Sequence, residues 1–388
     1  MEGAARVTAR AAGILLVAVI LSGIVSVRAS VMAHDDGALA VEASTTTAYL
    51  SVMEAGADVI ANADPTHNLS ASDPFSGLAY QADALARAAR AVAASDPARS
   101  QRYTSVAITI ANYLVRHDAL APNGQLGWGR PDAWDAFGDG TVNPAHQVYA
   151  FQTALVSWAL LDVYTLTHNT TYLTTVERVM ASYLPHSTTR LGANCHSCRM
   201  FWYSTNANDA GRYVKNTNVL MGHVMALLYG ITGGSGYHTY ATQVYNEETY
   251  EIVQRGNYRY LGVNDPHFRS AVGPDAHIVL ETFGYSQIAA LLRIPASQTR
   301  ATFDRMVSTF WKCGGKCYST PIASGFTPPL TIYTEFMTCY PVSFNSAYLA
   351  GCARMISNPA LPHLSPFPLV GLLYALPSVT PALPPIAA

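Results

Sequence analysis

The feature that most restricts how this chain can fold is a phrase that recurs along it. Each copy holds the end of an apolar helix, a short turn, and a second helix that begins near an aromatic residue. Corresponding leucines, Leu161, Leu228 and Leu292, lie roughly 65 residues apart, which gives the period of the repeat. One such hairpin cannot bury its apolar face alone, so neighbouring copies are expected to pack together. The copies occupy residues 88–114, 159–184, 226–244 and 289–307, and residues 340–357 and 367–376 resemble parts of one more, degenerate copy.

The connections between these hairpins indicate how they are arranged. Every second connection is long, aromatic and polar, whereas repeats of an open solenoid are usually only about 34 to 47 residues long, with short loops. A closed ring of hairpins is therefore favoured over an open solenoid. In a ring, connections at the same phase of the repeat gather at one end and wall a cleft. The sequence predicts an all-α ring of five to six helical hairpins with long loops at one rim, formed by residues 119–144, 187–213, 253–275 and 313–340.

Helix signals near the N-terminus agree with this organisation. Residues 37–63 predict one helix, which ends at a cluster of breaking residues. Asp73-Pro74 offers a capping residue followed by proline at the first helical position, and Ser95-Asp96-Pro97 repeats the pattern. Helices are thus expected from Pro74 and from Pro97, the latter running to about His117.

The first residues have the three parts of a secretory signal. Arg6 and Arg10 precede an apolar run over residues 11–27, and small-residue cleavage sites end at Ala29 or Ala33. The run is short for a bilayer-spanning anchor. We therefore expect a cleaved signal at residues 1–29, possibly extending to 33, and a secreted protein with no other membrane association.

The rest of the chain is expected to form one ring domain, residues 34–376, and a Pro-rich tail, residues 377–388. Half of the residues are hydrophobic, which allows a sizeable core. The net charge is −2 and no basic runs occur, which argues against a nucleic-acid partner, because phosphate binding requires clustered Lys and Arg. A monomer is expected.

Six cysteines fit an oxidising compartment. Local disulfides are the simplest pairing, although fifteen pairings are possible for six cysteines. The alternative is a structural zinc site made of the first four thiolates, near His196. Asn68 and Asn169 are glycosylation acceptors if the source is eukaryotic. The expected local pairs are Cys195/Cys198, Cys313/Cys317 and Cys339/Cys352.

One connection, within residues 127–164, combines polar and aromatic residues in a way that a simple linker does not require. It carries Asp132, Asp135 and Asp139 beside Trp128 and Trp134. From about residue 144 the apolar residues recur at steps of three and four, which predicts a helix with one buried face. Function is therefore expected in the loop and stability in the helix.

Two turn phrases, ALLDVYTLTHNTTYL and ALLYGITGGSGYHTYA, and the acidic aromatic loop before a hairpin resemble the (α/α) toroid, or six-hairpin glycosidase-like, superfamily. The resemblance covers most of residues 45–360. It departs at Gly234, where the superfamily phrase has Asp, and at Pro295, which replaces the fourth turn. The resemblance implies an (α/α)5–6 toroid. It also implies a secreted enzyme, either a glycoside hydrolase or a polysaccharide lyase. Fold alone does not fix the activity.

Glycoside hydrolysis needs a protonated carboxyl as acid and an ionised carboxylate as base or nucleophile. The chosen catalytic candidates are Asp135, Asp139, Glu281 and Glu335. Glu281 lies in an apolar helix, where burial would raise its pKa and suit it to act as acid. The two aspartates have alternative roles in shaping a Gly-rich turn or in binding calcium; otherwise no cofactor or metal is expected. Further loop carboxylates are Asp132, Asp209, Asp265 and Asp275.

A lyase or uronate epimerase would instead need a Tyr or His base and Asn or Arg to neutralise an acid group. Residues 206–223 contain a suitable set, although the same residues also suit a capped helix with His223 in the core. His146 begins the predicted helix of the first connection and either faces the cleft or only starts that helix. The set comprises Asn206, Asn208, Arg212, Tyr213, Asn218 and His223.

Loop aromatic residues favour a carbohydrate ligand, because sugar rings stack on aromatic faces. The leading hypothesis is a glycoside hydrolase acting on a poly- or oligosaccharide. The alternatives are the lyase or epimerase and a non-catalytic glycan-binding surface protein. The loop aromatics include Phe137, Tyr203 and Tyr260, and the residues expected to bind substrate are Trp128, Trp134, His146, Trp202, Asn208, Arg212, Tyr213 and Tyr258.

Overall fold

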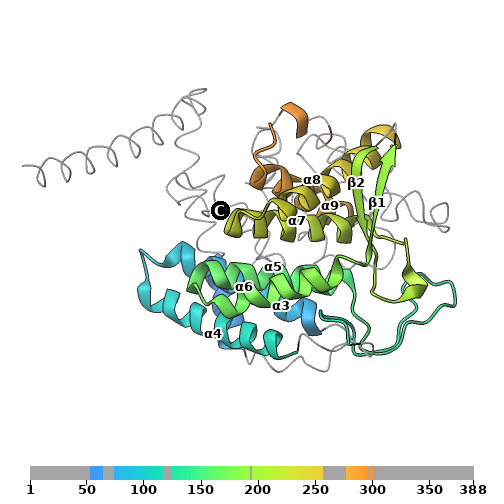
Figure 1. Ribbon diagram of the computed structural model, residues 1–388. Coiled ribbons are helices and arrows are strands. Elements are labelled where there is room, and N and C mark those ends of the chain that lie inside the picture. Colours follow the sequence, from blue (N-terminus) through green and yellow to red (C-terminus); the bar gives the residue numbers. More distant parts are fainter. Residues whose placement is uncertain are drawn as a thin grey trace, which may run out of the picture. The chain divides into compact units, whose positions relative to one another are not determined.

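The computed structural model describes seven stretches of the chain, all within the compact unit Thr45–Ala388 (Figure 1). The expected signal at residues 1–29, with its possible extension to 33, and the expected tail at residues 377–388 lie outside them. The described residues are 53–63, 74–117, 124–192, 195–256, 277–295, 297–299 and 302.

The described part is built from helical hairpins, as the repeated phrase predicts. Residues 53–62 are helical and pack against the second helix of the first hairpin, where Tyr103 donates a hydrogen bond to Asp58. A further helix follows the third described hairpin. The hairpins are α3 (Pro74–Val92) with α4 (Pro97–Arg116), α5 (Ala150–Thr167) with α6 (Thr170–Tyr183), and α7 (Lys215–Thr232) with α8 (Ser235–Thr249), and the following helix is α9 (His277–Leu291).

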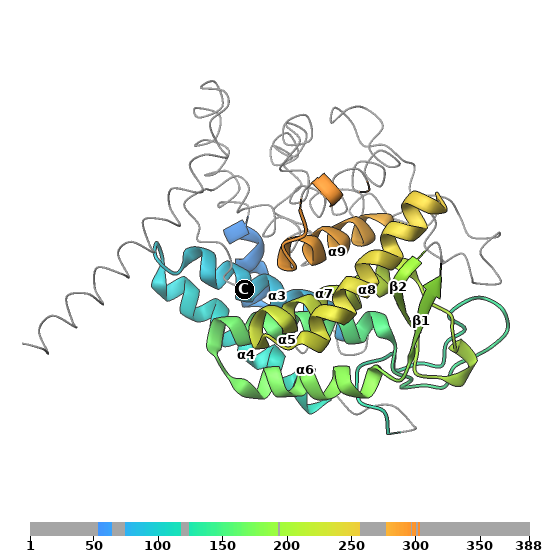
Figure 2. The same ribbon diagram turned by 45° about the horizontal axis from the view of Figure 1, so that its top comes forward.

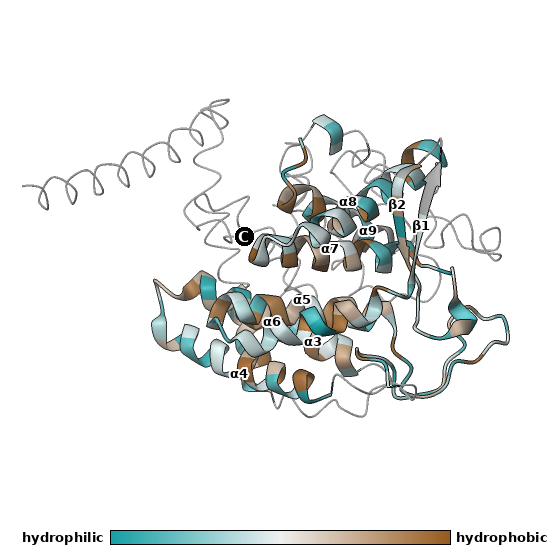
Figure 3. Ribbon diagram, viewed as in Figure 1, coloured by the Kyte–Doolittle hydropathy of each residue, from teal (hydrophilic) through white to brown (hydrophobic). Residues whose placement is uncertain are grey.

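The first helix of each hairpin belongs to an inner layer. α5 contacts both α3 and α7, and α7 contacts α9, so these four helices lie side by side in chain order (Figure 2). α5 and α7 are buried over most of their length, whereas α4 and α6 bury one face only. Figure 3 shows both hydrophilic and hydrophobic residues around the turns of α4. This two-layer arrangement confirms the predicted all-α ring of hairpins.

The caps of the outer helices follow from local sequence. The Asp96 carboxylate accepts a hydrogen bond from the backbone N–H of Arg99, and proline follows it at the start of α4, as predicted. Asn169 caps α6 by accepting from the N–H of Thr171. Such side chains satisfy backbone donors that have no partner within the helix.

The inner helices α5, α7 and α9 are each followed by a residue in the left-handed conformation. These residues are His168 (φ 55°), Gly233 (φ 72°) and Arg293 (φ 55°). The turn geometry thus repeats although the residue type changes, and only Gly233 adopts it without steric cost. The fourth turn, which departs from the resembled phrase at Pro295, retains the same backbone form.

Two glycines allow α7 and α9 to approach closely. A Cβ atom at Gly222 would lie 2.6 Å from Val244 Cγ1 and 2.8 Å from Ile288 Cδ1. A Cβ atom at Gly284 would lie 3.0 Å from Val219 Cγ2 and 3.2 Å from that residue's backbone carbon. Side chains larger than hydrogen would separate the two helices.

Two features of the connections differ from the sequence-based expectation. α5 begins at Ala150 rather than near residue 144, because the residues before it form β-bridges, Gly129 with Val148 and Tyr149 with Ser204. An antiparallel hairpin, β1 (Ser187–Gly192) and β2 (Cys195–Phe201), occupies the connection between α6 and α7, where no strand was expected. The first feature depends on a contact between segments distant in sequence, Tyr149 with Ser204, whereas the strand hairpin pairs neighbouring segments.

Candidate functional site

Two of the four predicted rim connections are described, and they contact each other where α5 and α7 begin. The backbone N–H of Ala150 donates to the carbonyl of Tyr203 at 2.9 Å, and the N–H of Thr205 donates to the carbonyl of Val148 at 3.1 Å. The N–H of Tyr203 in turn donates to the carbonyl of Arg212. The predicted gathering of long loops at one rim is therefore confirmed for these two, while residues 257–276 and 313–340 lie outside the described part.

An aromatic cluster covers this contact. We call Trp134, Phe137, Tyr149 and Tyr203 the rim cluster. The ring centroid of Trp134 lies 5.3 Å from that of Tyr149 and 6.0 Å from that of Tyr203, with the rings edge to face in both pairs. Phe137 lies 5.4 Å from Tyr203. Three predicted loop aromatics, Trp134, Phe137 and Tyr203, thus lie together with Tyr149.

Two arginines stack on the rim cluster. The guanidinium carbon of Arg130 lies 4.5 Å from the ring centroid of Trp134, and that of Arg212 lies 3.5 Å from Phe137. Arg212 also forms an ion pair with Asp139, with 2.5 Å between the nitrogen and the carboxylate oxygen. Arg212 was a predicted site residue, whereas no signal in the sequence distinguishes Arg130.

The two candidate catalytic aspartates lie in the same turn. Asp135 accepts hydrogen bonds from the backbone N–H groups of Phe137, Asp139 and Gly140. These bonds, led by the one from Gly140, lower the pKa of Asp135. The hydrogen bond from Thr141 N–H and the pairing with Arg212 lower the pKa of Asp139 to about 2. Both carboxylates are therefore ionised at neutral pH and resemble a base more than an acid.

Beneath the rim cluster lies a third carboxylate, Asp209. It is 3% exposed, and its Oδ2 accepts hydrogen bonds from Asn143 Nδ2 at 2.8 Å and Ser204 Oγ at 2.5 Å. Burial raises the pKa of the neighbouring Tyr149 to about 12, so this hydroxyl stays protonated. Asp209 appeared among the loop carboxylates in the sequence, yet nothing in its local pattern showed that it joins the two connections.

The other predicted rim residues are spread over core and surface. Trp128 is fully buried and its indole N–H donates to the carbonyl of Leu114, so it presents no face to a ligand. Trp202 is partly exposed, and its indole N–H donates to Thr188 Oγ1. His146 and Asn208 are exposed. Trp202, His146 and Asn208 are therefore accessible to solvent, whereas Trp128 is not.

Glu281 lies in the interior rather than at the surface of the rim. It is 0% exposed on α9 and pairs with Lys215, the first residue of α7, at 2.7 Å. The same ammonium group lies 3.1 Å from a carboxylate oxygen of Glu248 on α8. Burial alone would lower the pKa of Lys215, but the two carboxylates outweigh it and raise the pKa. Glu281 is therefore part of a buried ion-paired cluster.

Burial raises the pKa of Glu248 to about 8, despite the opposing effect of Lys215, and the nearby Glu281 adds to the increase. Glu248 is 1% exposed, and this burial favours its protonated form. The sequence predicted a raised pKa for a buried helical glutamate, but at Glu281. The glutamate whose pKa is raised is Glu248, which lies on the outer helix α8.

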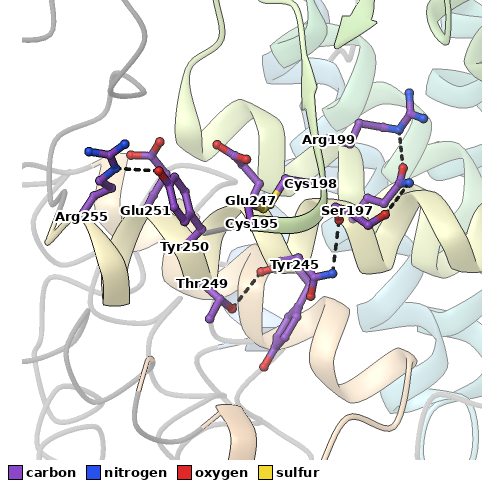
Figure 4. Close-up of a disulfide and its surroundings, with 12 residues drawn as sticks. Cys195, Ser197, Cys198, Arg199, Tyr245, Glu247, Thr249, Tyr250, Glu251 and Arg255 are labelled. Atoms are coloured by element: carbon purple, nitrogen blue, oxygen red, sulfur yellow. Dashed lines mark hydrogen bonds between the residues drawn. A yellow bond between two sulfur atoms is a disulfide. The ribbon is translucent and has the colours of Figure 1, made fainter. Parts of the chain in front are cut away.

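A second buried group adjoins this cluster. The hydroxyl of Tyr213 contacts carboxylate oxygens of Glu247 and Glu251, each at 2.8 Å, and burial raises its pKa. Figure 4 shows the Cys195–Cys198 disulfide beside Glu247. The pair Cys195/Cys198 was expected; the other four cysteines lie outside the described residues.

Among the described residues, Cys195, Cys198 and Glu247 form one group whose potential metal-ligand atoms lie within 4.8 Å of one another. A disulfide sulfur carries no thiolate charge, and thiolate is the form that binds zinc. In the disulfide form seen here, the residues therefore do not provide the thiolates of the zinc alternative.

The residues of the lyase alternative do not converge. Asn218 is buried and binds the backbone of β2, accepting from the N–H of Phe201 and donating to the carbonyl of Arg199. His223 is buried between Trp158 and Phe283, with ring centroids 5.1 Å and 5.9 Å away, and burial lowers its pKa to about 3. These two residues lie in the interior with Tyr213, whereas Asn206, Asn208 and Arg212 lie on the rim connection. Glu335, Tyr258, Tyr260, Asp265 and Asp275 are outside the described residues.

Comparison with solved structures identifies the architecture. A family 76 glycoside hydrolase from a bovine Bacteroides thetaiotaomicron strain aligns with a TM-score of 0.53 at 12% identity, over 79% of this chain and 69% of that one. A family 76 mannosidase from Bacteroides thetaiotaomicron aligns with a TM-score of 0.52 at 10% identity, over 87% and 98%. The chain has the (α/α) toroid fold of these structures.

A third structure, a family 76 α-mannanase from Bacteroides thetaiotaomicron, aligns with a TM-score of 0.51 at 12% identity, over 90% of this chain and 96% of that one. At such identities the similarity concerns the toroid and not the activity. The sequence matches no protein-family model and no curated protein. Within the described residues, no helix combines the length and the apolar character needed to cross a bilayer.

Proposed function

We propose that this protein is a secreted glycoside hydrolase that binds a poly- or oligosaccharide across the rim cluster. The observation that supports the proposal best is the rim itself, where four aromatic rings from two connections adjoin the ionised Asp135 and Asp139. Aromatic faces and a few polar groups on a rigid helical scaffold are what sugar binding requires. The similarity of fold to glycoside hydrolases agrees with this proposal.

In this proposal Asp139 is the base or nucleophile. Its low pKa keeps it ionised, and it lies at the edge of the rim cluster through Arg212 and Phe137. The acid must come from another carboxyl, because hydrolysis needs one protonated and one ionised group. Glu335, in the fourth predicted connection, is the proposed acid. Glu281, enclosed with Lys215, is not proposed to touch the substrate.

The test uses the full-length mature protein and a panel of neutral and acidic polysaccharides. A hydrolase releases reducing ends without a new ultraviolet absorbance, whereas a lyase produces an unsaturated product that absorbs. Asp139→Asn and Glu335→Gln should each abolish the release of reducing ends. Asp132→Asn is the matched control, because Asp132 is an exposed carboxylate in the same connection.

Arg212→Gln removes the cation that pairs with the carboxylate of Asp139. If Asp139 acts as base, this variant should keep part of the activity that Asp139→Asn loses. Full activity in Asp139→Asn would reject the assigned role. A wild-type product that absorbs ultraviolet light would indicate elimination instead of hydrolysis. Tyr213 and His223 are buried and therefore provide no accessible base for elimination.

A non-catalytic glycan-binding protein is the second candidate. It is favoured by the three backbone hydrogen bonds that Asp135 already accepts, since these engage both of its carboxylate oxygens. Such a protein would retain glycans in affinity electrophoresis and release no reducing ends. Trp134→Ala should then abolish retention, and Trp128→Phe, a change in the core, should not.

Secretion is supported by the N-terminal signal pattern and by the Cys195–Cys198 disulfide. Mass spectrometry of protein secreted by a eukaryotic host should give an N-terminus after Ala29 or after Ala33. A retained Met1 in the mature protein would contradict a cleaved signal.

A further inference from the structure

The turn between α5 and α6 carries the pattern Asn-x-Thr that N-glycosylation requires. It consists of Asn169, Thr170 and Thr171, and all three residues are exposed. The buried face of α6 begins only afterwards, at Tyr172. An attached oligosaccharide is bulky and hydrated, so it must stay at the surface of the folded protein. The turn meets this requirement, whereas the second such pattern, at Asn68, lies outside the described residues.

Asn169 also has a structural role, because it is the N-cap of α6. Its Oδ1 accepts a hydrogen bond of 3.1 Å from the backbone N–H of Thr171. Its own backbone N–H donates to Thr167 Oγ1 at 3.3 Å. Such a cap satisfies a backbone donor that has no partner within the helix. The oxygen of the side-chain amide is thus engaged, whereas an N-linked oligosaccharide is attached to the nitrogen.

Capping and glycosylation therefore use different atoms of the Asn169 amide. Glycosylation leaves Oδ1 in place, so the hydrogen bond from the N–H of Thr171 is retained. Nδ2 carries two hydrogens, one to be replaced by the sugar and one available for the Tyr172 hydroxyl, which the amide contacts. That hydroxyl itself donates to Asn112 Oδ1 at 3.0 Å, so it keeps a partner in either case. A glycosylated chain is able to form the same α6 as an unmodified one.

The turn is remote from the rim cluster. α5 begins beside the contact between the two described connections and spans 18 residues, so its far end lies about 27 Å from that contact. Asn169 follows this end, directly after His168, whose left-handed conformation reverses the chain. An oligosaccharide attached there is separated from Trp134 and Asp139 by the length of α5. Modification of the turn is therefore compatible with a ligand at the rim.

We propose that Asn169 accepts an N-linked oligosaccharide when a eukaryotic cell exports the chain, and that it still caps α6 once it is modified. In the transfer, Nδ2 gives up one proton and forms a bond to the anomeric carbon of an oligosaccharide. The bond from that carbon to a lipid pyrophosphate breaks, and the lipid pyrophosphate leaves with the bonding electrons. The inference rests on the secretion proposed above and is independent of glycoside hydrolysis.

The test expresses the full-length chain in a eukaryotic host and collects the secreted protein. A peptide N-glycosidase in water labelled with heavy oxygen converts a glycosylated asparagine to labelled aspartate, which peptide mass spectrometry detects. We expect the label at position 169 in the wild type and in Thr171→Ser, which keeps the required pattern. Thr171→Ala should abolish the label, because it removes the hydroxyl that the pattern requires. Peptide mapping distinguishes Asn169 from Asn68.

A second measurement separates the cap from the modification. It uses protein from a bacterial host without N-glycosylation, and it follows urea unfolding by circular dichroism. Asn169→Gln should lower the midpoint, because glutamine is not among the preferred N-cap residues. Asn169→Asp keeps an oxygen that accepts from the N–H of Thr171, and Thr171→Ala keeps that N–H, so neither should lower the midpoint. An unchanged midpoint in Asn169→Gln would overturn the capping role.

The outcomes distinguish glycosylation from secretion. An unlabelled position 169 in secreted wild-type protein with a cleaved signal would overturn glycosylation at Asn169 and leave secretion standing. A chain that stays inside the cell, with Met1 present and Asn169 unmodified, would overturn both. Label at position 169 in Thr171→Ala would also contradict the inference, because modification would then not depend on the pattern in the turn.

Discussion

The raised pKa of Glu248 leads to a quantitative prediction about the free energy of unfolding. Glu248 is buried with Lys215 and Glu281, and its pKa is raised to about 8 from the ordinary value of 4.5. Between these two values the folded protein binds more protons than the unfolded chain, so the free energy of unfolding falls as pH rises. The stability associated with this group is fully present below about pH 4.5 and is lost as pH rises through about 8.

The perturbation is Glu248→Gln, because glutamine has the shape of the protonated acid and does not titrate. For one isolated group the slope is at most about 1.4 kcal/mol per pH unit, so the wild type would lose on the order of 4 kcal/mol by pH 8. This is an upper bound, because Lys215 and Glu281 titrate together with Glu248. The variant should therefore match the wild type near pH 5 and exceed it in stability at pH 8.

The assay is urea unfolding at half-unit pH steps from 5 to 8.5, with Glu177→Gln as the control. Glu177 is a partly exposed glutamate on α6, and its substitution should leave the difference between pH 5 and pH 8 unchanged. The reasoning would be refuted if Glu248→Gln destabilised the protein equally at all pH values. That result would mean that Glu248 is ionised in the folded state and contributes through its pairing with Lys215.

The remaining predictions concern the inner helices and the rim. Arg87→Met would leave the buried carboxylates of Asp83 and Asp162 without their shared cation, at a cost on the order of 3 to 5 kcal/mol in chemical denaturation; a loss below about 1 kcal/mol would contradict this account. Gly129→Ala would place its Cβ 1.7 Å from a backbone carbonyl oxygen and should prevent native folding, as judged by near-ultraviolet circular dichroism. Native-like behaviour of Gly129→Ala would show that Gly129 does not approach the Gln147 carbonyl so closely. Gly77→Ala, on an exposed helical face with open space, should instead raise stability by about 0.5 to 1 kcal/mol.

The fold was predictable because its signals are local. Helix periodicity, the caps at Asp96 and Asn169, and the spacing of the repeat all lie within single hairpins, and the hairpins follow from them. The start of α5 was misplaced because the preceding residues pair with Ser204, more than fifty positions away. Only a contact between two connections decides that these residues are extended rather than helical.

The site was harder to predict because residue type does not determine burial. Trp128 and Trp134 occupy the same connection. Trp128 lies in the core, where its indole N–H donates to the carbonyl of Leu114, whereas Trp134 lies in the rim cluster. Glu281 was expected to be a lone buried acid, but Lys215, one of only three lysines, pairs with it from another helix.

The glycine contact between α7 and α9 has a consequence for how such a protein can adapt to different ligands. Gly222 and Gly284 bring the two helices so close together that an added methyl group would have to displace a facing side chain or the helices themselves. Evolution of larger residues at these two positions is therefore restricted. If the protein binds glycans as proposed, differences in ligand preference between related toroids are expected in the connections rather than at this helix contact.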